Sequence, residues 1–202
     1  MSTDAKSSQA PASLLTARLS LRKPELSDAE AIFRRYASDP VATEYMSWPT
    51  HHTVDDTLAF LAWSDADWQQ WAAGTYLVFA REPAGLLLGS TGLSFQNPEV
   101  AITGYIFAHD AWGKGFATES LSAMVSLARD LGVRRLESVC HVHHRASAHV
   151  MEKCGFQYEG ILPAHTVFPN IALGQRFDVL SYSIRFDDQN ETSTGSVTRS
   201  TD

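Results

Sequence analysis

Hydrophobic and polar positions follow two different periods along this chain, one typical of helices and one typical of strands. The clearest helical pattern begins after Ala117, where apolar side chains recur on one face at the roughly 3.6-residue spacing of a helix. These side chains are Leu121, Met124, Val125, Ala128 and Leu131. Gly132 comes next, and helices commonly end in a left-handed glycine. The pattern predicts a long amphipathic helix that ends near Leu131.

Three further helices are predicted from their starts and their apolar faces. Ser27 and Glu30 have the spacing of a capping box, which opens a first helix. Its apolar side chains are Ile32, Phe33 and Tyr36. Thr53 and Asp56 open a second helix. Its apolar side chains are Leu58, Leu61, Ala62 and Trp68. A third helix is predicted over Arg145–Cys154.

Runs with the alternation of strands fill the rest of the chain. The first holds Leu19 and Leu21 and closes at Pro24. The others are Thr75–Ala80, Leu86–Phe95, Val100–Ala108, Leu136–Val142, Phe156–Ile161 and Arg176–Arg185. Turn residues between the second, third and fourth runs predict an antiparallel meander. The order of elements predicts an α/β fold, with a mixed, mostly antiparallel central sheet and helices on both faces.

Both ends of the chain are polar, which predicts disordered tails over residues 1–13 and 187–202. The stretch between them, 14–186, contains no internal repeat and no linker. A chain of 202 residues with 44% hydrophobic content is long enough to fill one core. We therefore expect a single domain.

Charge and cysteine content exclude several classes of protein. The formal net charge of −7 argues against a nucleic-acid partner, which would favour a basic face. Cys140 and Cys154 are the two cysteines, and they have neither a disulfide framework nor metal-ligand spacing. The chain has no apolar run of membrane-spanning length and no apolar signal core at its start. We expect a cytoplasmic protein without a membrane partner.

The loop before the long helix, from Trp112 to Ala117, is the main candidate for a binding site. Gly113 and Gly115 let the backbone turn sharply and approach a ligand. The first turn of the helix offers free N–H groups and the positive end of the helix dipole, which favour phosphate, and Lys114 adds positive charge. The spacing is neither that of a Walker loop nor that of a dinucleotide fingerprint, so an ordinary glycine turn is an equal alternative on spacing alone.

A wider string around this loop carries a family resemblance. Gly104–Ile106 (GYI) and Trp112–Glu119 (WGKGFATE) resemble the acetyl-CoA-binding segment of GNAT-family N-acetyltransferases. The nearer resemblance is to the branch that acetylates the N-termini of ribosomal proteins, the RimJ/RimL type. Gly115 and Ala117 match the family pattern Arg/Gln-x-x-Gly-x-Gly/Ala, whereas Trp112 stands at its Arg/Gln position.

The resemblance implies a GNAT-like sheet, acetyl-CoA as co-substrate and no metal. The residues implied to bind acetyl-CoA are Tyr105, Ile106, Phe107, Gly113, Lys114, Gly115, Phe116, Ala117, Thr118 and His144. The string from His144 to Phe156 resembles the family's N-x-x-S…EKxGF helix. Ser147 is thereby implied as the catalytic residue that protonates the departing thiolate. His144 replaces the usual asparagine, and an imidazole can still form a hydrogen bond with the pantetheine arm.

By resemblance, a primary amine attacks the thioester directly, and a base is needed because only the neutral amine attacks. The candidate bases are Glu99, His109, Glu44 and His165. Two alternatives are transfer to a small amine (an antibiotic, a polyamine or an amino acid) and a non-catalytic CoA-binding module. Assembly as a homodimer is left open.

Four histidines were weighed as a metal site and two stretches as the acceptor site. The histidines are His141, His143, His144 and His149, and they lack a cysteine or acidic partner at zinc spacing, which favours ordinary polar or core roles. Cys154 is interpreted as a packing thiol. Aromatic, imidazole and carboxylate side chains gather in Glu44–His52 and Trp63–Trp71. These are Tyr45, Trp48, His51, His52, Trp63, Trp68, Trp71, Glu44, Asp55, Asp56, Asp65 and Asp67.

In GNAT proteins the acceptor enters in this region, between the first strand and the meander. Rings beside carboxylates suit a cationic amine, through cation–π contact and Coulomb attraction. Trp68 belongs to the apolar helix face and is expected in the core. A protein or peptide N-terminus is the acceptor that we favour, and the alternative is that these residues form a solvated helix face with core anchors.

Overall fold

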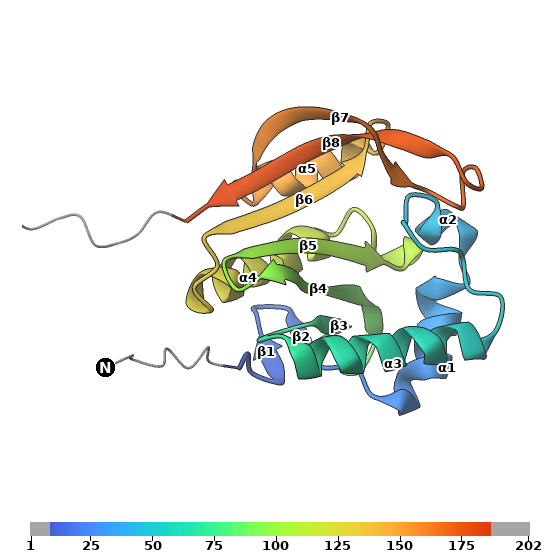
Figure 1. Cartoon of the computed structure of the whole chain (residues 1–202). Coiled ribbons are helices and arrows are strands. Elements are labelled where there is room, and N and C mark those ends of the chain that lie inside the picture. The colour runs from blue at the N-terminus through green and yellow to red at the C-terminus, as the bar shows by residue number, and fades with distance from the viewer. Residues whose placement is uncertain (1–8, 187–202) are drawn as a thin grey trace, which may run out of the picture.

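The structure is a computed structural model that describes residues 9–186. The parts of the predicted tails at 1–8 and 187–202 lie outside the described residues. Within 9–186, eight strands form one sheet in the order β1-β2-β3-β4-β5-β6-β8-β7 (Figure 1). The strands are β1 (Ser13–Leu15), β2 (Leu19–Arg22), β3 (Thr75–Ala80), β4 (Leu87–Asn97), β5 (Val100–Phe107), β6 (Arg135–His141), β7 (Gln157–Val167) and β8 (Arg176–Arg185).

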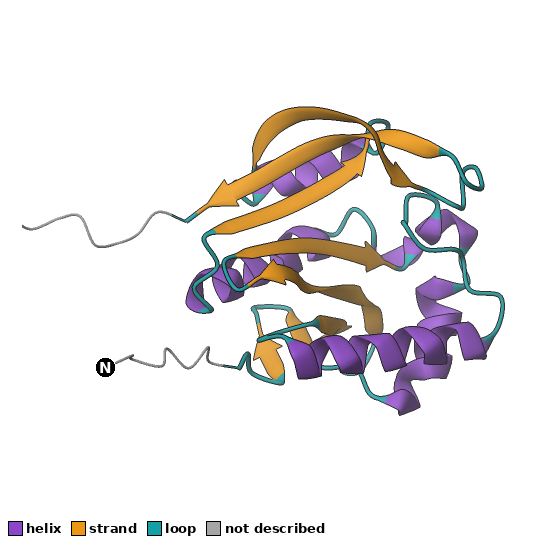
Figure 2. Ribbon diagram, in the orientation of Figure 1, coloured by secondary structure: helices purple, strands orange, loops and turns teal. Residues whose placement is uncertain are grey.

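Helices cover both faces of the sheet (Figure 2), so the predicted α/β class with a mostly antiparallel sheet is confirmed. One face carries α1 (Ala29–Ile32), which continues as a helical turn over Phe33–Ala37, and α3 (Val54–Gln70). The short α2 (Pro40–Thr43) lies beside them, and α4 (Phe116–Asp130) and α5 (Arg145–Lys153) cover the other face. Buried clusters beneath the two layers include Ile32, Tyr36, Leu61, Leu77 and Ile106 under α1 and α3, and Leu121, Met124, Ala128, Leu136 and Met151 under α4 and α5.

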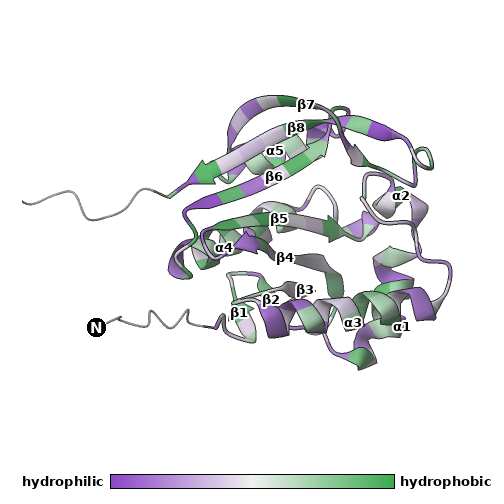
Figure 3. Ribbon diagram, in the orientation of Figure 1, coloured by the Kyte–Doolittle hydropathy of each residue, from purple (hydrophilic) through white to green (hydrophobic). Residues whose placement is uncertain are grey.

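The long helix predicted after Ala117 is confirmed as α4. Leu121, Met124 and Ala128 are buried on the face that the 3.6-residue period selects. Gly132 follows the helix with a φ of +80°, the left-handed conformation expected there. Figure 3 shows hydrophobic residues along β5, which lies in front of α4 and receives this face.

The predicted start of α3 is confirmed, and of the four side chains predicted for its apolar face two are buried, Leu61 and Trp68, and two are not. The Thr53 side chain accepts from the Asp56 N–H as the helix cap. Leu58 is 36% exposed and Ala62 is also exposed. The side chains that face inward are Thr57, Leu61, Ser64 and Trp68. All four lie on one side of the helix, so the polar Thr57 and Ser64 are buried there in place of the predicted Leu58 and Ala62.

The capping box predicted for Ser27 and Glu30 is also wrong. The carboxylate of Asp28 accepts from the backbone N–H of Glu25 at 2.7 Å and closes the first helical turn there. Asp28 is oriented by an ion pair with Arg22 of β2, with 2.6 Å between Oδ1 and Nη2. The position of Arg22 on β2 therefore determines which residue caps the helix, and the capping-box spacing alone could not predict it.

Residues 9–13 lie against the core, in a region that the sequence assigned to a tail. The Gln9 side-chain amide donates to the carbonyls of Trp68 and Trp71. Ala10 is buried, and Ser13 begins β1, which pairs antiparallel with β2. The domain limits of 14–186 stay a prediction. In the part of the chain that the structure describes, no helix is long and apolar enough to cross a membrane.

Strands β5 and β6 are parallel neighbours that separate along their length. They pair only where Val100–Ile102 meets Arg135–Glu137. β5 continues to Phe107 and keeps its antiparallel pairing with β4 throughout. From Thr103 onward, the edge of β5 that faces β6 has no strand partner among residues 9–186. The Thr103 carbonyl accepts from the Ser138 hydroxyl and the Phe107 carbonyl from the Trp112 indole. The backbone groups of Tyr105 between them can bond an extended ligand.

Candidate active site

The predicted glycine-rich loop lies between β5 and α4, and both of its glycines are left-handed. Their φ angles are +73° at Gly113 and +79° at Gly115, a region that strains other residues. Gly115 is the N-cap of α4, and no side chain within 9–186 caps the first turn. The helix leaves the N–H groups over 116–118 without internal partners, at the positive end of its dipole. These donors can bind an anionic group, phosphate above all.

An arginine from the start of β2 braces this loop, and the sequence did not indicate it. The Arg18 Nη1 donates to the Lys114 carbonyl at 2.9 Å, and its Nε donates to the Glu119 carboxylate at 2.7 Å. The same carboxylate accepts from the Thr16 hydroxyl at 2.6 Å. A Cβ built on Gly115 would lie 3.4 Å from the Arg18 Nη2. The brace therefore fixes the first turn of α4 and adds a guanidinium beside the loop.

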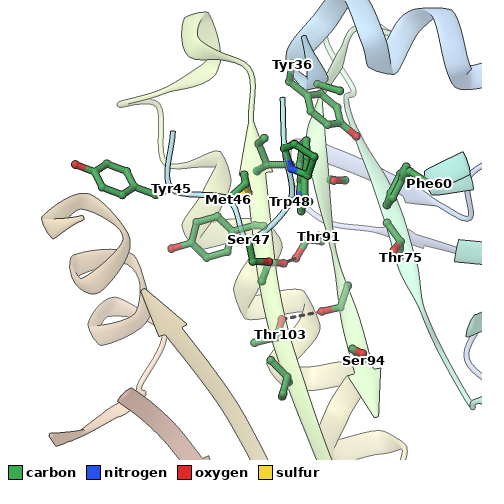
Figure 4. A pocket seen from close by; sticks show the side chains of 18 of the residues that line it. Tyr36, Tyr45, Met46, Ser47, Trp48, Phe60, Thr75, Thr91, Ser94 and Thr103 are labelled. Carbon is green, nitrogen blue, oxygen red and sulfur yellow. Dashed lines mark hydrogen bonds between the residues drawn. The ribbon is translucent and has the colours of Figure 1, made fainter. Parts of the chain in front are cut away.

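A cavity of about 950 Å³ opens on the face of the sheet that carries α1 and α3. Its floor is Ser90–Ser94 of β4 and Ile102–Ile106 of β5, and it reaches Ser138–Cys140 of β6 and Ser147 at the unpaired edge of β5. Figure 4 shows Tyr45 on one side of the floor and Phe60 and Thr75 on the other. The glycine loop is not part of its lining, so loop and cavity are two sites that meet along β5.

Tyr105 of β5 and Ser147 of α5 meet across the opening between β5 and β6. The Tyr105 hydroxyl lies 2.9 Å from the Ser147 Oγ and donates to the Ser147 carbonyl at 3.2 Å. Burial raises the pKa of Tyr105 well above its ordinary value, so the phenol stays protonated at neutral pH. The family resemblance implies Tyr105 only as a residue that binds acetyl-CoA, and the structure shows that its hydroxyl also contacts the Ser147 hydroxyl.

His144 precedes α5, and its ring stacks on that of Tyr45, with 4.6 Å between centroids and 16° between planes. Burial, followed by the nearby His141, lowers the pKa of His144, so the imidazole is neutral at pH 7. A neutral ring offers one donor and one acceptor to a ligand. The residue that replaces the family's asparagine therefore lines the cavity as a neutral hydrogen-bonding group.

The other histidines and cysteines pack instead of converging. Among residues 9–186, no group of three or more His, Cys, Asp or Glu side chains is placed to hold a metal ion. His141 is buried against the rings of Phe168 and Phe177. Burial raises the pKa of the Cys140 thiol to about 11, so it is not a thiolate at neutral pH. The Cys154 thiol lies 3.4 Å from the Thr118 carbonyl and joins α5 to α4.

Asn170, from the segment between β7 and β8, fastens the loop over 44–52 that forms one wall of the cavity. Its side-chain oxygen accepts from the backbone N–H and the hydroxyl of Thr50, at 2.8 and 3.1 Å. Its side-chain nitrogen donates to the carbonyls of Thr43 and Trp48, at 2.6 and 3.0 Å. One amide thereby satisfies both ends of a loop that has little regular structure of its own.

We expect an Asn170→Ala variant to lose about 2 kcal/mol in the free energy of unfolding, because each of its hydrogen bonds contributes about 0.5–1.5 kcal/mol and backbone groups would be left unsatisfied. Urea unfolding followed by circular dichroism measures the change. Asn170→Asp is the matched control, since it keeps the acceptor and loses the donors. A stability equal to that of the parent in both variants would contradict the clamp.

The family profile described as "Acetyltransferase (GNAT) domain" matches residues 18–157, more than half of the chain. The chain belongs to the GNAT acetyltransferase family. It is 31% identical over 174 residues to the uncharacterized N-acetyltransferase YoaA of Bacillus subtilis (strain 168), covering 85% of this chain and 95% of that protein. It is 28% identical over 174 residues to the uncharacterized N-acetyltransferase p20 of Bacillus licheniformis, covering 85% and 94%.

Solved structures with the same fold bind CoA species. The microcin C7 self-immunity acetyltransferase MccE, in complex with acetyl-CoA and AMP, has a TM-score of 0.77 and 22% identity over 89% of this chain and 99% of that chain. RimL, a ribosomal L7/L12 alpha-N-protein acetyltransferase in complex with coenzyme A, has a TM-score of 0.75 and 23% identity over 86% and 97%. This GNAT domain is an acetyl-CoA-dependent acetyltransferase.

Of the four candidate bases in this GNAT acetyltransferase, His165 lines the cavity. Glu99 is at the turn between β4 and β5, where its carbonyl accepts from the N–H groups of Arg134 and Arg135. His109 packs edge-on against Trp112 just after β5, and Glu44 is exposed outside the lining. The sequence could not show which of the four bases lies at the cavity, because their distances from it depend on loops that come together only in the folded chain.

Some of the acceptor residues predicted for this GNAT domain line the cavity, and others lie in the core or outside the cavity. Trp68 is in the core, as predicted, and Trp71 stacks on Phe95 with 5.8 Å between centroids. Seven of the predicted residues line the cavity: Tyr45, Trp48, His51, His52, Asp56, Trp63 and Asp67. Glu44, Asp55 and Asp65 lie outside the lining. The predicted stretches thus supply one wall, β4 and β5 supply the floor, and side chains from α1, β3, β6, α5 and β7 complete the lining.

Proposed function

We propose that this GNAT acetyltransferase transfers the acetyl group of acetyl-CoA to a primary amine, with the N-terminus of a protein or peptide as the favoured acceptor. One observation carries the proposal: the cavity of about 950 Å³ reaches both the unpaired edge of β5 and the hydroxyl of Ser147. An acceptor in the cavity and a thioester along β5 would therefore meet beside Ser147.

The glycine loop would bind the pyrophosphate of acetyl-CoA. Its support is the left-handed pair Gly113 and Gly115, the uncapped N–H groups of the first turn of α4, and the positive charge of Lys114. The pantetheine arm would follow the free edge of β5 from Tyr105 to Phe107 as an added strand. His144 would offer its ring nitrogen to the same arm.

The chemical step would be direct attack of the amine nitrogen on the thioester carbon. The new C–N bond forms, the C–S bond breaks, and a backbone N–H of β5 stabilises the oxyanion between the two events. The departing thiolate takes the proton of the Ser147 hydroxyl, which regains one from solvent through Tyr105. The amine loses its proton to a base, and His165 is the candidate that lines the cavity.

Two observations bear on the acceptor. RimL, which has this fold, is described as acting on the N-terminus of a ribosomal protein, and a peptide N-terminus could enter the cavity between α3 and the loop over 44–52. The volume is also within the range of small-molecule pockets, and MccE was solved with AMP beside acetyl-CoA. The second observation keeps a small amine as the alternative acceptor.

We expect release of free thiol from acetyl-CoA with peptides that begin with Ala or Ser, and no release with the same peptides blocked at the N-terminus, because a blocked amine cannot attack. The assay measures thiol with a colorimetric reagent, against a panel of polyamines, amino acids and aminoglycosides. Turnover restricted to that small-molecule panel would replace the peptide proposal with its alternative. Tight CoA binding without turnover on any amine would indicate a non-catalytic module.

A further inference from the structure

The charged side chains that line the cavity are all acidic. Its lining, within the described residues, contains two carboxylates, Asp56 and Asp67, and neither lysine nor arginine. Two of its histidines, His51 and His144, are kept neutral because burial lowers the pKa of each. An acceptor in this space therefore meets negative charge, and an acceptor with a second positive group would be attracted to it.

Of the two carboxylates, Asp67 is the one that is free to bind a ligand. Asp56 is occupied by the helix cap, accepting from the backbone N–H groups of His52 and Thr53 at 2.9 Å each. The Asp67 carboxylate makes no hydrogen bond and no ion pair with any residue over 9–186. Its neighbour on the helix, Asp65, points away and is bound by Lys23 at 2.8 Å.

Aromatic rings on the same face of α3 lie beside Asp67. Phe60, Trp63 and Asp67 are spaced by three and four residues, so they follow one another along one side of the helix. The rings of Phe60 and Trp63 are 6.1 Å apart, and both line the cavity with Asp67. Trp63 is 53% exposed, a large hydrophobic surface that a ligand could cover.

We infer that the end of the cavity at α3 is a binding site for a second cationic group of the acceptor, with Asp67 as its counter-ion and Trp63 as its ring. The inference rests on the proposed function, since it assumes that the acceptor occupies this cavity. The reacting nitrogen must be neutral beside the thioester, whereas the second group remains protonated and is held by Asp67. The acceptor class is therefore a molecule with two basic groups, such as a peptide with lysine near its N-terminus.

The floor of the cavity limits the distance between these two groups. Thr75 of β3, whose carbonyl accepts from the indole of Trp68 beside Asp67, is paired with Gly92 of β4, which is paired with Gly104 of β5. At about 4.8 Å per strand, this row crosses roughly 10 Å of the floor. Tyr105, next to Gly104, bonds Ser147, so this row leads from the Asp67 end of the cavity to the Ser147 end. The extended side chain of a lysine in the first three positions of a peptide can span a separation of this size.

The test compares a lysine peptide with a neutral isostere. The probes are the peptide amides Ala-Lys-Ala-Ala and Ala-Ala-Lys-Ala, each paired with its norleucine analogue. Initial rates give kcat/KM, and calorimetry on the CoA-saturated protein gives affinity without turnover. We expect the parent to prefer at least one lysine peptide about tenfold, the usual size for a charged hydrogen bond. Asp67→Asn should reduce that preference to about one, with circular dichroism confirming that it folds.

Asp65→Asn is the control, because Asp65 lies outside the cavity and should keep the full preference. Equal use and equal affinity of lysine and norleucine peptides by the parent would overturn the inference, as would an undiminished preference in Asp67→Asn. The two proposals fail separately. Preferential binding of the lysine peptides without thiol release would remove the proposed function and keep the cation site, and turnover without preference would do the reverse.

Discussion

A Gly115→Glu variant should bind acetyl-CoA at least about 100-fold more weakly than the parent. The added carboxylate would stand beside the uncapped first turn of α4, where the proposed pyrophosphate lies. Two like charges at about 4 Å near a protein surface repel by several kcal/mol, and about 2.7 kcal/mol already corresponds to a 100-fold loss. Isothermal titration calorimetry with acetyl-CoA measures the effect.

The backbone at Gly115 requires its own control, because its φ of +79° strains any residue with a Cβ. Gly115→Asn serves here, since asparagine tolerates the left-handed region and carries no charge. We expect it to lose much less affinity than the glutamate variant. If Gly115→Glu folds and binds acetyl-CoA as the parent does, the loop is not the pyrophosphate site.

A Ser147→Ala variant should lower kcat by about 100-fold while leaving the affinity for acetyl-CoA nearly unchanged. The hydroxyl is proposed to protonate the thiolate only as the C–S bond breaks, and general acid catalysis of this kind contributes about 100-fold or more. A group that acts only in the transition state lowers kcat and kcat/KM together. Steady-state kinetics with a peptide that the parent acetylates measures both constants.

A Tyr105→Phe variant tests whether Tyr105 positions the Ser147 hydroxyl, separately from the proton transfer proposed for Ser147 itself. It keeps the ring and the strand and removes the hydroxyl that lies 2.9 Å from the Ser147 Oγ. We expect a smaller fall in kcat, because Ser147 would still reach the thiolate but would be held less firmly. A Ser147→Ala enzyme that turns over at the parent's kcat would remove Ser147 from the mechanism, whatever the phenotype of Tyr105→Phe.

The sequence by itself determined the elements whose signals are local. The apolar period of α4 and the glycine that follows it are properties of neighbouring residues, so they were predicted with the correct face. The strands of the meander were likewise predicted to within about two residues, since alternation and turn residues specify them. The family resemblance was carried by short continuous strings, in which the glycines of the loop stand at fixed positions.

Local signals failed where a distant element decided the outcome. Asp28 took the place in the capping box expected of Glu30, because Arg22 on the adjoining strand orients its carboxylate. Thr57 and Ser64 of α3 are buried because packing against the sheet and α1 sets the rotation of the helix about its axis. The spacing of apolar residues within α3 does not predict that rotation. β1 was missed because a three-residue strand becomes recognisable only through its pairing with β2.

The candidate active site likewise combines residues that the sequence predicted with residues that only the tertiary structure brings together. The sequence supplied the glycine-rich loop and Ser147, which lie in continuous motifs. The tertiary structure alone brought Arg18 to Glu119, Tyr105 to Ser147, and Asn170 to the loop over 44–52, pairs that are 101, 42 and about 120 residues apart. It also gave Asp65 and Asp56 partners, whereas the Asp67 carboxylate has none among residues 9–186. Periodicity reports which side of an element faces inward, whereas the partner of a charged side chain depends on contacts that only the folded chain creates.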